Sequence, residues 1–132
     1  KDINIATTIA EAVKEVDASL ILFGLANSES GKAAEKVGLN FYNEVFADRT
    51  YTEQGQLTPR TEPNAMITTD EEAIQQVMQM LQEETVTSTN GKIIPIQADT
   101  ICIHGDGEHA LSFAEQINRL IKKSNIKISS RA

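Results

Sequence analysis

The chain has 132 residues, of which 40% are hydrophobic and 23% are charged, with a formal net charge of -7 at pH 7 and one cysteine. This length suits a single domain, and no apolar run approaches the roughly 18 residues that cross a bilayer, so we expect no membrane segment. The acidic balance disfavours nucleic acid as a partner, because phosphate backbones attract basic surfaces. One cysteine and the absence of a signal-like start lead us to expect a cytoplasmic protein.

The first third of the chain alternates helical and strand patterns. Helices are predicted over residues 3–16 and 28–37, and strands over residues 19–23 and 39–46. Asp2 is the expected N-cap of the first helix, and Gly38 supplies the left-handed residue that closes the second. The first strand is apolar without alternation, as in a strand buried on both faces, and we expect Gly24 to end it.

The rest of the chain begins with a connection over residues 47–63 that is longer than most and has no sustained periodicity. Thr69 begins a capping box for the next helix, and Asn90-Gly91 marks a turn between two extended pieces, the second confined to an edge by Pro95. The predicted elements are a helix over 70–84, extended pieces over 85–88 and 92–97, a strand over 100–104, a helix around 111–121 and an extended tail over 126–128.

This alternation predicts an α/β fold, a mostly parallel sheet with flanking helices. Three firm strands make a small sheet whose edges need covering, so we expect self-association or pairing with another chain. The chain also opens on Lys1 and directly on a helical pattern, which suggests a fragment of a larger protein.

The segment over residues 100–107 is the strongest candidate for chemistry, because side chains at the carboxyl end of a parallel strand reach the crevice where ligands bind. It places His104 and Asp106 there. Together with His109 they could hold a metal ion, since imidazole and carboxylate suit zinc or manganese. Asp106 could instead be the N-cap of the following helix. Cys102 is expected to be a small core residue.

A second cluster follows the strand over residues 39–46. Glu44, Asp48 and Arg49 lie at its end and at the start of the long connection. A carboxylate on a strand face is costly unless it is paired or functional, so the cluster is either a site or a structural ion pair of Arg49. Arg60, further along, is either an anion clamp or a solvated side chain.

Four segments together resemble the LamB/YcsF family, the A subunits of prokaryotic 5-oxoprolinases. The matching pieces are Glu44-Val45-Phe46-Ala47-Asp48-Arg49-Thr50-Tyr51, Gly55-Gln56-Leu57 with Arg60, Ala65-Met66-Ile67, and Ile101-Cys102-Ile103-His104-Gly105-Asp106. Their order and spacing agree along nearly the whole chain. Family members are about twice this long, so residues 1–132 resemble a single domain that forms the carboxyl-terminal portion of a larger β/α barrel.

The resemblance implies a distorted β/α barrel of the glycoside hydrolase/deacetylase type and the ATP-dependent opening of 5-oxo-L-proline to L-glutamate, with 5-oxoprolinase subunits B and C as partners. It implies Glu44, His104 and Asp106 as catalytic residues, and Asp48, Arg49 and Arg60 as substrate-binding residues. ATP is the implied cofactor. A divalent metal such as Mg or Zn would have His104 and Asp106 as candidate ligands. The alternatives are a metal-dependent deacetylase-like hydrolase of carbohydrate amides and a non-catalytic binding or scaffold protein within the enzyme.

Overall fold

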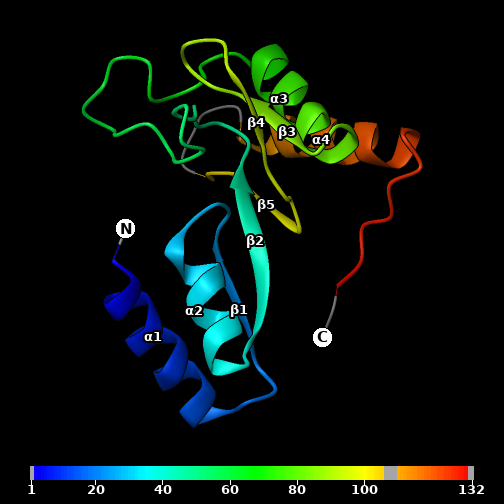
Figure 1. Ribbon diagram of the computed structural model, residues 1–132. Coiled ribbons are helices and arrows are strands. Elements are labelled where there is room, and N and C mark those ends of the chain that lie inside the picture. The colour runs from blue at the N-terminus through cyan, green and yellow to red at the C-terminus, as the bar shows by residue number, and fades with distance from the viewer. Residues whose placement is uncertain (1, 106–109, 131–132) are drawn as a thin grey trace.

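The computed structural model describes residues 2–105 and 110–130. Its elements are α1 (Ile3–Val16), β1 (Ile21–Leu25), α2 (Glu29–Val37), β2 (Asn40–Phe46), α3 (Asp70–Gln82), β3 (Thr85–Thr87), β4 (Ile93–Pro95), β5 (Thr100–Cys102) and α4 (Ala110–Lys123). Figure 1 shows their arrangement. Helices and strands alternate through much of the chain, as predicted.

The central sheet has three parallel strands in the order β1-β2-β5, and β3 and β4 form a separate antiparallel hairpin. Parallel neighbours need long crossovers, which are supplied here by α2 and by the segment containing α3 and the hairpin. This confirms the α/β class with a mostly parallel sheet and flanking helices. Within the described residues the sheet is open and does not close into a barrel.

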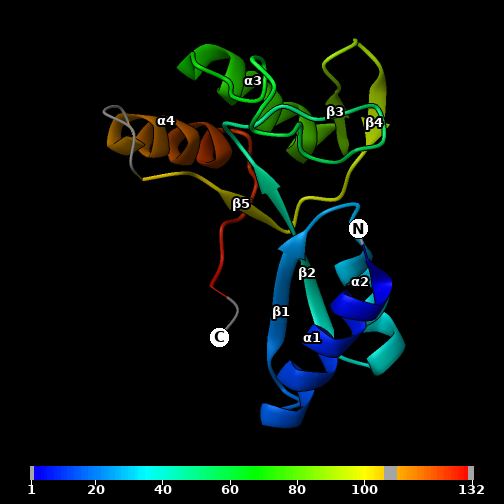
Figure 2. The ribbon, with the colours of Figure 1, turned by 90° about the vertical axis from the view of Figure 1, so that its left-hand side faces the viewer.

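Helices α1 and α2 cover β1 and the first part of β2 from one side (Figure 2). Small side chains allow this close packing, because Ala10, Ala33 and Ala34 are fully buried where the two helices meet. Leu22 and Phe41 pack against the same cluster from the strands. One side of the sheet is therefore a hydrophobic layer.

Helices α3 and α4 complete the core around the carboxyl ends of β2 and β5. Their buried Val77, Phe113 and Ile117 form one cluster, against which Ile101 and Ile103 pack. Val45, the neighbour of Ile101 in the parallel register, belongs to a second hydrophobic cluster, which also contains Met80 of α3. Alternating residues of each strand thus point into the helical layers.

The other side of the sheet is what we call the open face. Among the strand residues on this side, the register aligns six across the sheet: Phe23, Tyr42, Glu44, Phe46, Thr100 and Cys102. Phe23 is 52% exposed and meets the ring of Tyr42 edge-on at 5.5 Å between centroids. This face combines aromatic rings with a carboxylate and a thiol, and it leads directly to the residues that follow the strands.

The predicted capping residues and the predicted turn are confirmed, although α3 ends at Gln82, two residues earlier than expected. The side chain of Asp2 accepts hydrogen bonds from the backbone N–H groups of Asn4 and Ile5, and that of Thr69 accepts one from Glu72. Gly38 closes α2 with φ of 69°, in the left-handed region. The expected turn at Asn90-Gly91 joins β3 to β4.

Several strand boundaries differ from the prediction by one or two residues; β1, for example, covers Ile21–Leu25 where residues 19–23 were expected. Gly24 does not end β1 but lies inside it, because the ring of Phe41 packs so closely that a Cβ on Gly24 would lie 2.7 Å from it. Strand β5 ends at Cys102, two residues earlier than expected. Cys102 therefore lies half-buried at the end of the strand on the open face, and the expectation that it is a small core residue was wrong.

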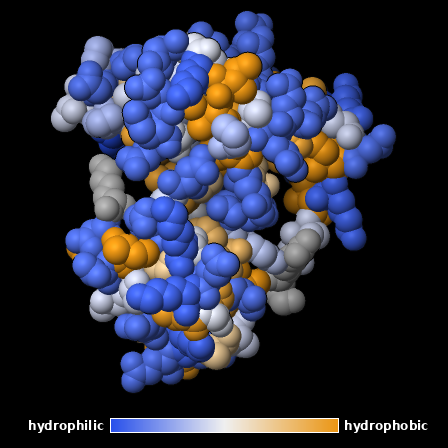
Figure 3. Space-filling model, viewed as in Figure 1, coloured by the Kyte–Doolittle hydropathy of each residue, from blue (hydrophilic) through white to orange (hydrophobic). Residues whose placement is uncertain are grey.

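The surface carries several exposed apolar side chains (Figure 3). Ile5, Ile9 and Val16 on α1 are each more than half exposed. Among the residues that the structure describes, no helix has the length and apolar character to span a membrane.

Candidate active site

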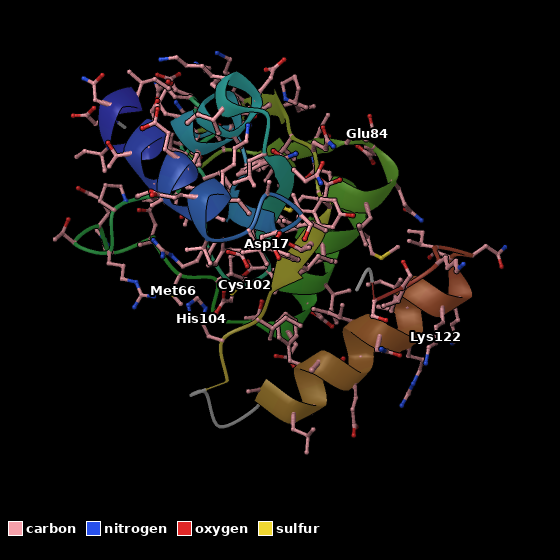
Figure 4. The ribbon with its side chains drawn as sticks, turned by 90° about the horizontal axis from the view of Figure 1, so that it is seen from below. Asp17, Met66, Glu84, Cys102, His104 and Lys122 are labelled. Atoms are coloured by element: carbon pink, nitrogen blue, oxygen red, sulfur yellow. The ribbon has the colours of Figure 1, made fainter. Side chains whose placement is uncertain are left out.

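The ends of β2 and β5 bring Asp48 and His104 together. Phe46 and Cys102 are partners in the parallel register, and each is followed two residues later by one of these side chains. The contact is short: Asp48 Oδ2 and His104 Nδ1 are 2.7 Å apart. Figure 4 labels Cys102, at the end of β5, and His104, which follows it, together with Met66, which forms a β-bridge with Arg49 next to Asp48. The sequence predicted both residues near the strand ends but did not predict that they pair.

Arg60 meets the other side of the imidazole. Its NH2 group lies 3.4 Å from His104 Nε2. A guanidinium can only donate, so this contact requires Nε2 to accept through its lone pair. In the tautomer that satisfies both contacts, Nδ1 carries the ring proton and donates it to Asp48. The unprotonated nitrogen of His104 is therefore the one directed away from Asp48.

The surroundings of the pair combine partial burial with access. The side chains of Asp48 and His104 are 17% and 29% exposed, and the ring of Phe46 lies 5.9 Å from the imidazole between centroids. Asp48 Oδ1 is buried without a hydrogen-bond partner among the described residues. One oxygen of this half-buried carboxylate thus holds the imidazole, while the other is buried and, among those residues, unpaired, which is unusual for a buried polar atom.

Glu44 and Cys102 lie close to this pair on the open face. Burial raises the pKa of the Cys102 thiol, and the nearby carboxylates of Glu44 and Asp48 raise it further. The thiol is therefore protonated at neutral pH, which argues against a nucleophilic role. Glu44 is half-buried, so it can approach a ligand on the open face but is separate from the hydrogen-bonded pair.

Arg49 is directed away from the open site into the long connection. It is 6% exposed, and its guanidinium donates to the backbone carbonyls of Ala65 at 3.1 Å and Thr58 at 2.6 Å. Within the described part of the chain it forms no ion pair with an acidic side chain. Its visible role is to fix the connection that carries Arg60, whereas Arg60 itself is exposed beside His104.

The remaining predicted site residues, Asp106 and His109, lie outside the described residues. In the part of the chain that is described, no three His, Cys, Asp or Glu side chains gather as a metal site would require. The described residues therefore do not by themselves fit a metal centre, and no chemical step is assigned to one.

Sequence reasoning gave no role to two residues that support the site. Gln76 on α3 donates from its side-chain amide to backbone carbonyls at the end of β2, and the hydroxyl of Tyr51 accepts a hydrogen bond from the backbone N–H of Phe46 at 2.9 Å. A detectable signal existed for Gln76, because it is a polar residue at helical spacing between the buried Ala73 and Met80.

Comparisons with known proteins agree with this architecture. Curated proteins that bear the name of the 5-oxoprolinase A subunit are similar over 98% of the chain, at 50% identity in Bacillus subtilis and 52% in Staphylococcus haemolyticus. The crystal structure of a lactam utilization protein from Thermus thermophilus superimposes with a TM-score of 0.86 at 33% identity, over 97% of this chain and 51% of that one. The chain spans about half the length of these relatives: 50% and 52% of the two curated proteins. The LamB/YcsF family model matches residues 1–132, and the chain therefore belongs to the LamB/YcsF family.

Proposed function

We propose that this chain supplies catalytic residues to a 5-oxoprolinase as part of the enzyme's A subunit, and that the enzyme opens the lactam of 5-oxo-L-proline to L-glutamate. The observation that supports it most directly is the Asp48–His104 pair at the carboxyl ends of two parallel strands. Relatives at about half identity bear the name of this enzyme component. A lactam-cleaving hydrolase needs a base that activates water, and the pair has that form.

The chemistry follows from the tautomer of His104. A lactam carbonyl is a poor electrophile, so attack by water requires removal of a proton from the water as the C–O bond forms. His104 Nε2 carries the free lone pair and takes that proton, while Asp48 stabilises the imidazolium through Nδ1–H. Protonation of the lactam nitrogen then releases the amine as the C–N bond breaks. Glu44 and Asp106 are the candidates for the general acid that protonates the lactam nitrogen.

Arg60 is the residue that we propose for binding the substrate carboxylate. It is exposed, and its 3.4 Å contact with His104 is long for a hydrogen bond, so a carboxylate can draw the guanidinium away at little cost. That movement would uncover Nε2 as substrate arrives. Arg49, whose guanidinium donates to two backbone carbonyls, is the less suitable candidate.

ATP is proposed as the second substrate, and its role would be to phosphorylate the lactam oxygen, with release of ADP, and so make the ring carbon easier to attack. Water attack and C–N cleavage then leave an acyl phosphate of glutamate, and a second water molecule hydrolyses it to L-glutamate and phosphate. The described residues contain no glycine-rich phosphate loop, so we propose that subunits B and C contribute to nucleotide binding. A cytoplasmic location would provide this ATP.

We also propose that the open face becomes the interior of a distorted β/α barrel and that the isolated chain, with this face uncovered, self-associates.

The test is ATP-dependent release of glutamate from 5-oxo-L-proline by the full-length protein with its partner subunits. His104→Gln should abolish most turnover, whereas Asp17→Asn, at an exposed carboxylate that accepts hydrogen bonds from the neighbouring Ser19, should leave it unchanged. Metal-dependent deacetylation of a carbohydrate amide in place of lactam cleavage would favour the alternative hydrolase. Full turnover by His104→Gln would favour the scaffold alternative.

A further inference from the structure

The end of β2 is held by one side chain from a distant helix. Gln76, in the middle of α3, directs its amide nitrogen at the backbone carbonyl groups where the strand ends. Its Nε2 donates to the carbonyl oxygens of Phe46 at 3.1 Å, Ala47 at 3.4 Å and Arg49 at 2.9 Å. The amide has two hydrogens for three acceptors, so one hydrogen is shared.

These hydrogen bonds bracket Asp48. The carbonyl of Asp48, which Gln76 does not reach, accepts instead from the backbone N–H of Ile67 at 2.9 Å. The N–H of Ala47 donates to the carbonyl of Cys102. Every carbonyl from residue 46 to 49 is thus bonded, although the strand pairing of β2 has already ended at Phe46. Without Gln76, three of these four acceptors would lose a hydrogen-bond donor.

We propose that Gln76 is a positioning residue that fixes Asp48 against His104 and thereby sets the tautomer of the imidazole. The mechanistic part of this proposal rests on the proposed function, but the structural part does not. The 2.7 Å contact of Asp48 with Nδ1 depends on where the backbone of Asp48 lies, and Gln76 fixes the residues on both sides of it. Misplacement of a catalytic group by about 1 Å can reduce a rate by about 100-fold.

The helix is suited to this role because it is rigid and anchored. Ala73 and Val77, on either side of Gln76 along α3, are buried in the cluster shared with α4. Gln76 itself is half-buried, so its amide competes little with water for the carbonyls. The position of the amide is therefore set by the core and not by the long connection.

The experiment compares Gln76→Met with Gln79→Met in the full-length protein. Gln79 is a matched control: it is one turn along α3, equally half-buried, and also uses its amide, donating to Thr85 and accepting from Thr87. Two readouts are measured. The first is kcat/KM for 5-oxo-L-proline, and the second is the neutral tautomer of His104 from imidazole ¹⁵N chemical shifts, which needs no turnover.

We expect Gln76→Met to lower kcat/KM by about 10- to 100-fold and to move His104 from the Nδ1–H form towards the Nε2–H form. Gln79→Met should change neither. An unchanged tautomer in folded Gln76→Met would overturn the proposal, whether activity falls or not. If Gln76→Met does not fold, Gln76→Asn, which keeps the amide but shortens its reach, decides by the same two readouts. If the tautomer shifts in Gln76→Met but the wild type does not cleave the lactam, the positioning role of Gln76 stands and only the proposed function is refuted.

Discussion

Replacing Tyr51 by phenylalanine removes one oxygen atom from the support of the site. Tyr51 is fully buried among Val45, Met80 and Val86, and its hydroxyl accepts the backbone N–H of Phe46 at 2.9 Å. Phenylalanine keeps the ring but leaves that N–H without a partner. A buried donor left unsatisfied costs about 1–3 kcal/mol, so we expect the free energy of unfolding to fall by that amount at pH 8.

The same variant has a pH signature. Burial raises the pKa of Tyr51 to about 12 in the folded protein, despite the opposing effects of the Phe46 N–H and Arg49. The unfolded chain loses this proton near pH 10, so the stability contribution is complete below pH 10 and is lost as pH rises through 12. The wild type should therefore lose about 1.4 kcal/mol relative to Tyr51→Phe by pH 11.

Denaturant unfolding followed by circular dichroism measures both effects, with the slope m expected to be equal for the two proteins. Comparing the two proteins cancels the ionisation of Tyr42, which both contain. Equal stability at pH 8 would show that the hydroxyl does not support Phe46. A stability difference that stays constant from pH 9 to 11 would show that Tyr51 is not shielded as the structure indicates.

Three further substitutions separate the roles of neighbouring side chains. Arg49→Met should lower the free energy of unfolding by about 1–3 kcal/mol, because hydrogen bonds to two backbone carbonyls are lost, and should leave KM nearly unchanged. A raised KM with unchanged stability would show instead that Arg49 binds substrate. Arg60→Met should do the opposite, raising KM about 10-fold without loss of stability, and an unchanged KM would refute its proposed carboxylate contact. Glu44→Gln should lower the pKa of Cys102 and speed the alkylation of its thiol by iodoacetamide at pH 8, whereas Glu53→Gln, at an exposed position, should change neither. An unchanged alkylation rate in Glu44→Gln would show that this carboxylate does not act on the thiol.

Much of the fold could be predicted from the chain because local signals and burial agree there. Capping residues such as Asp2 and Thr69 act on their own helices, and the apolar run of β1 marks a strand without tertiary information. The predicted burial of that strand on both faces was wrong, because Phe23 is 52% exposed on the open face. Gly24 misled the prediction because the requirement for glycine comes from the ring of Phe41, which packs on it from a neighbouring strand. Such a close approach leaves no trace in the local sequence.

The location of the candidate site could be predicted from the sequence, but the hydrogen bonds between its side chains could not. Topology places residues after parallel strands at one edge, so His104 and Asp48 could be assigned to a common region. Their pairing joins side chains 56 residues apart and depends on the register of β2 with β5, which no local pattern encodes. The role of Gln76 depends on how α3 packs, and the burial of Arg49 depends on how the long connection folds back on itself.

The central claim is that Asp48 and His104 act as one unit in lactam hydrolysis, and a double-mutant cycle on kcat/KM tests it most directly. Asp48→Asn and His104→Gln are made singly and together in the full-length protein with its partner subunits. We expect each single substitution to lower kcat/KM by about 100- to 10,000-fold and the double variant to be no worse than the poorer single variant. Losses that multiply, or near-normal turnover in either single variant, would contradict it.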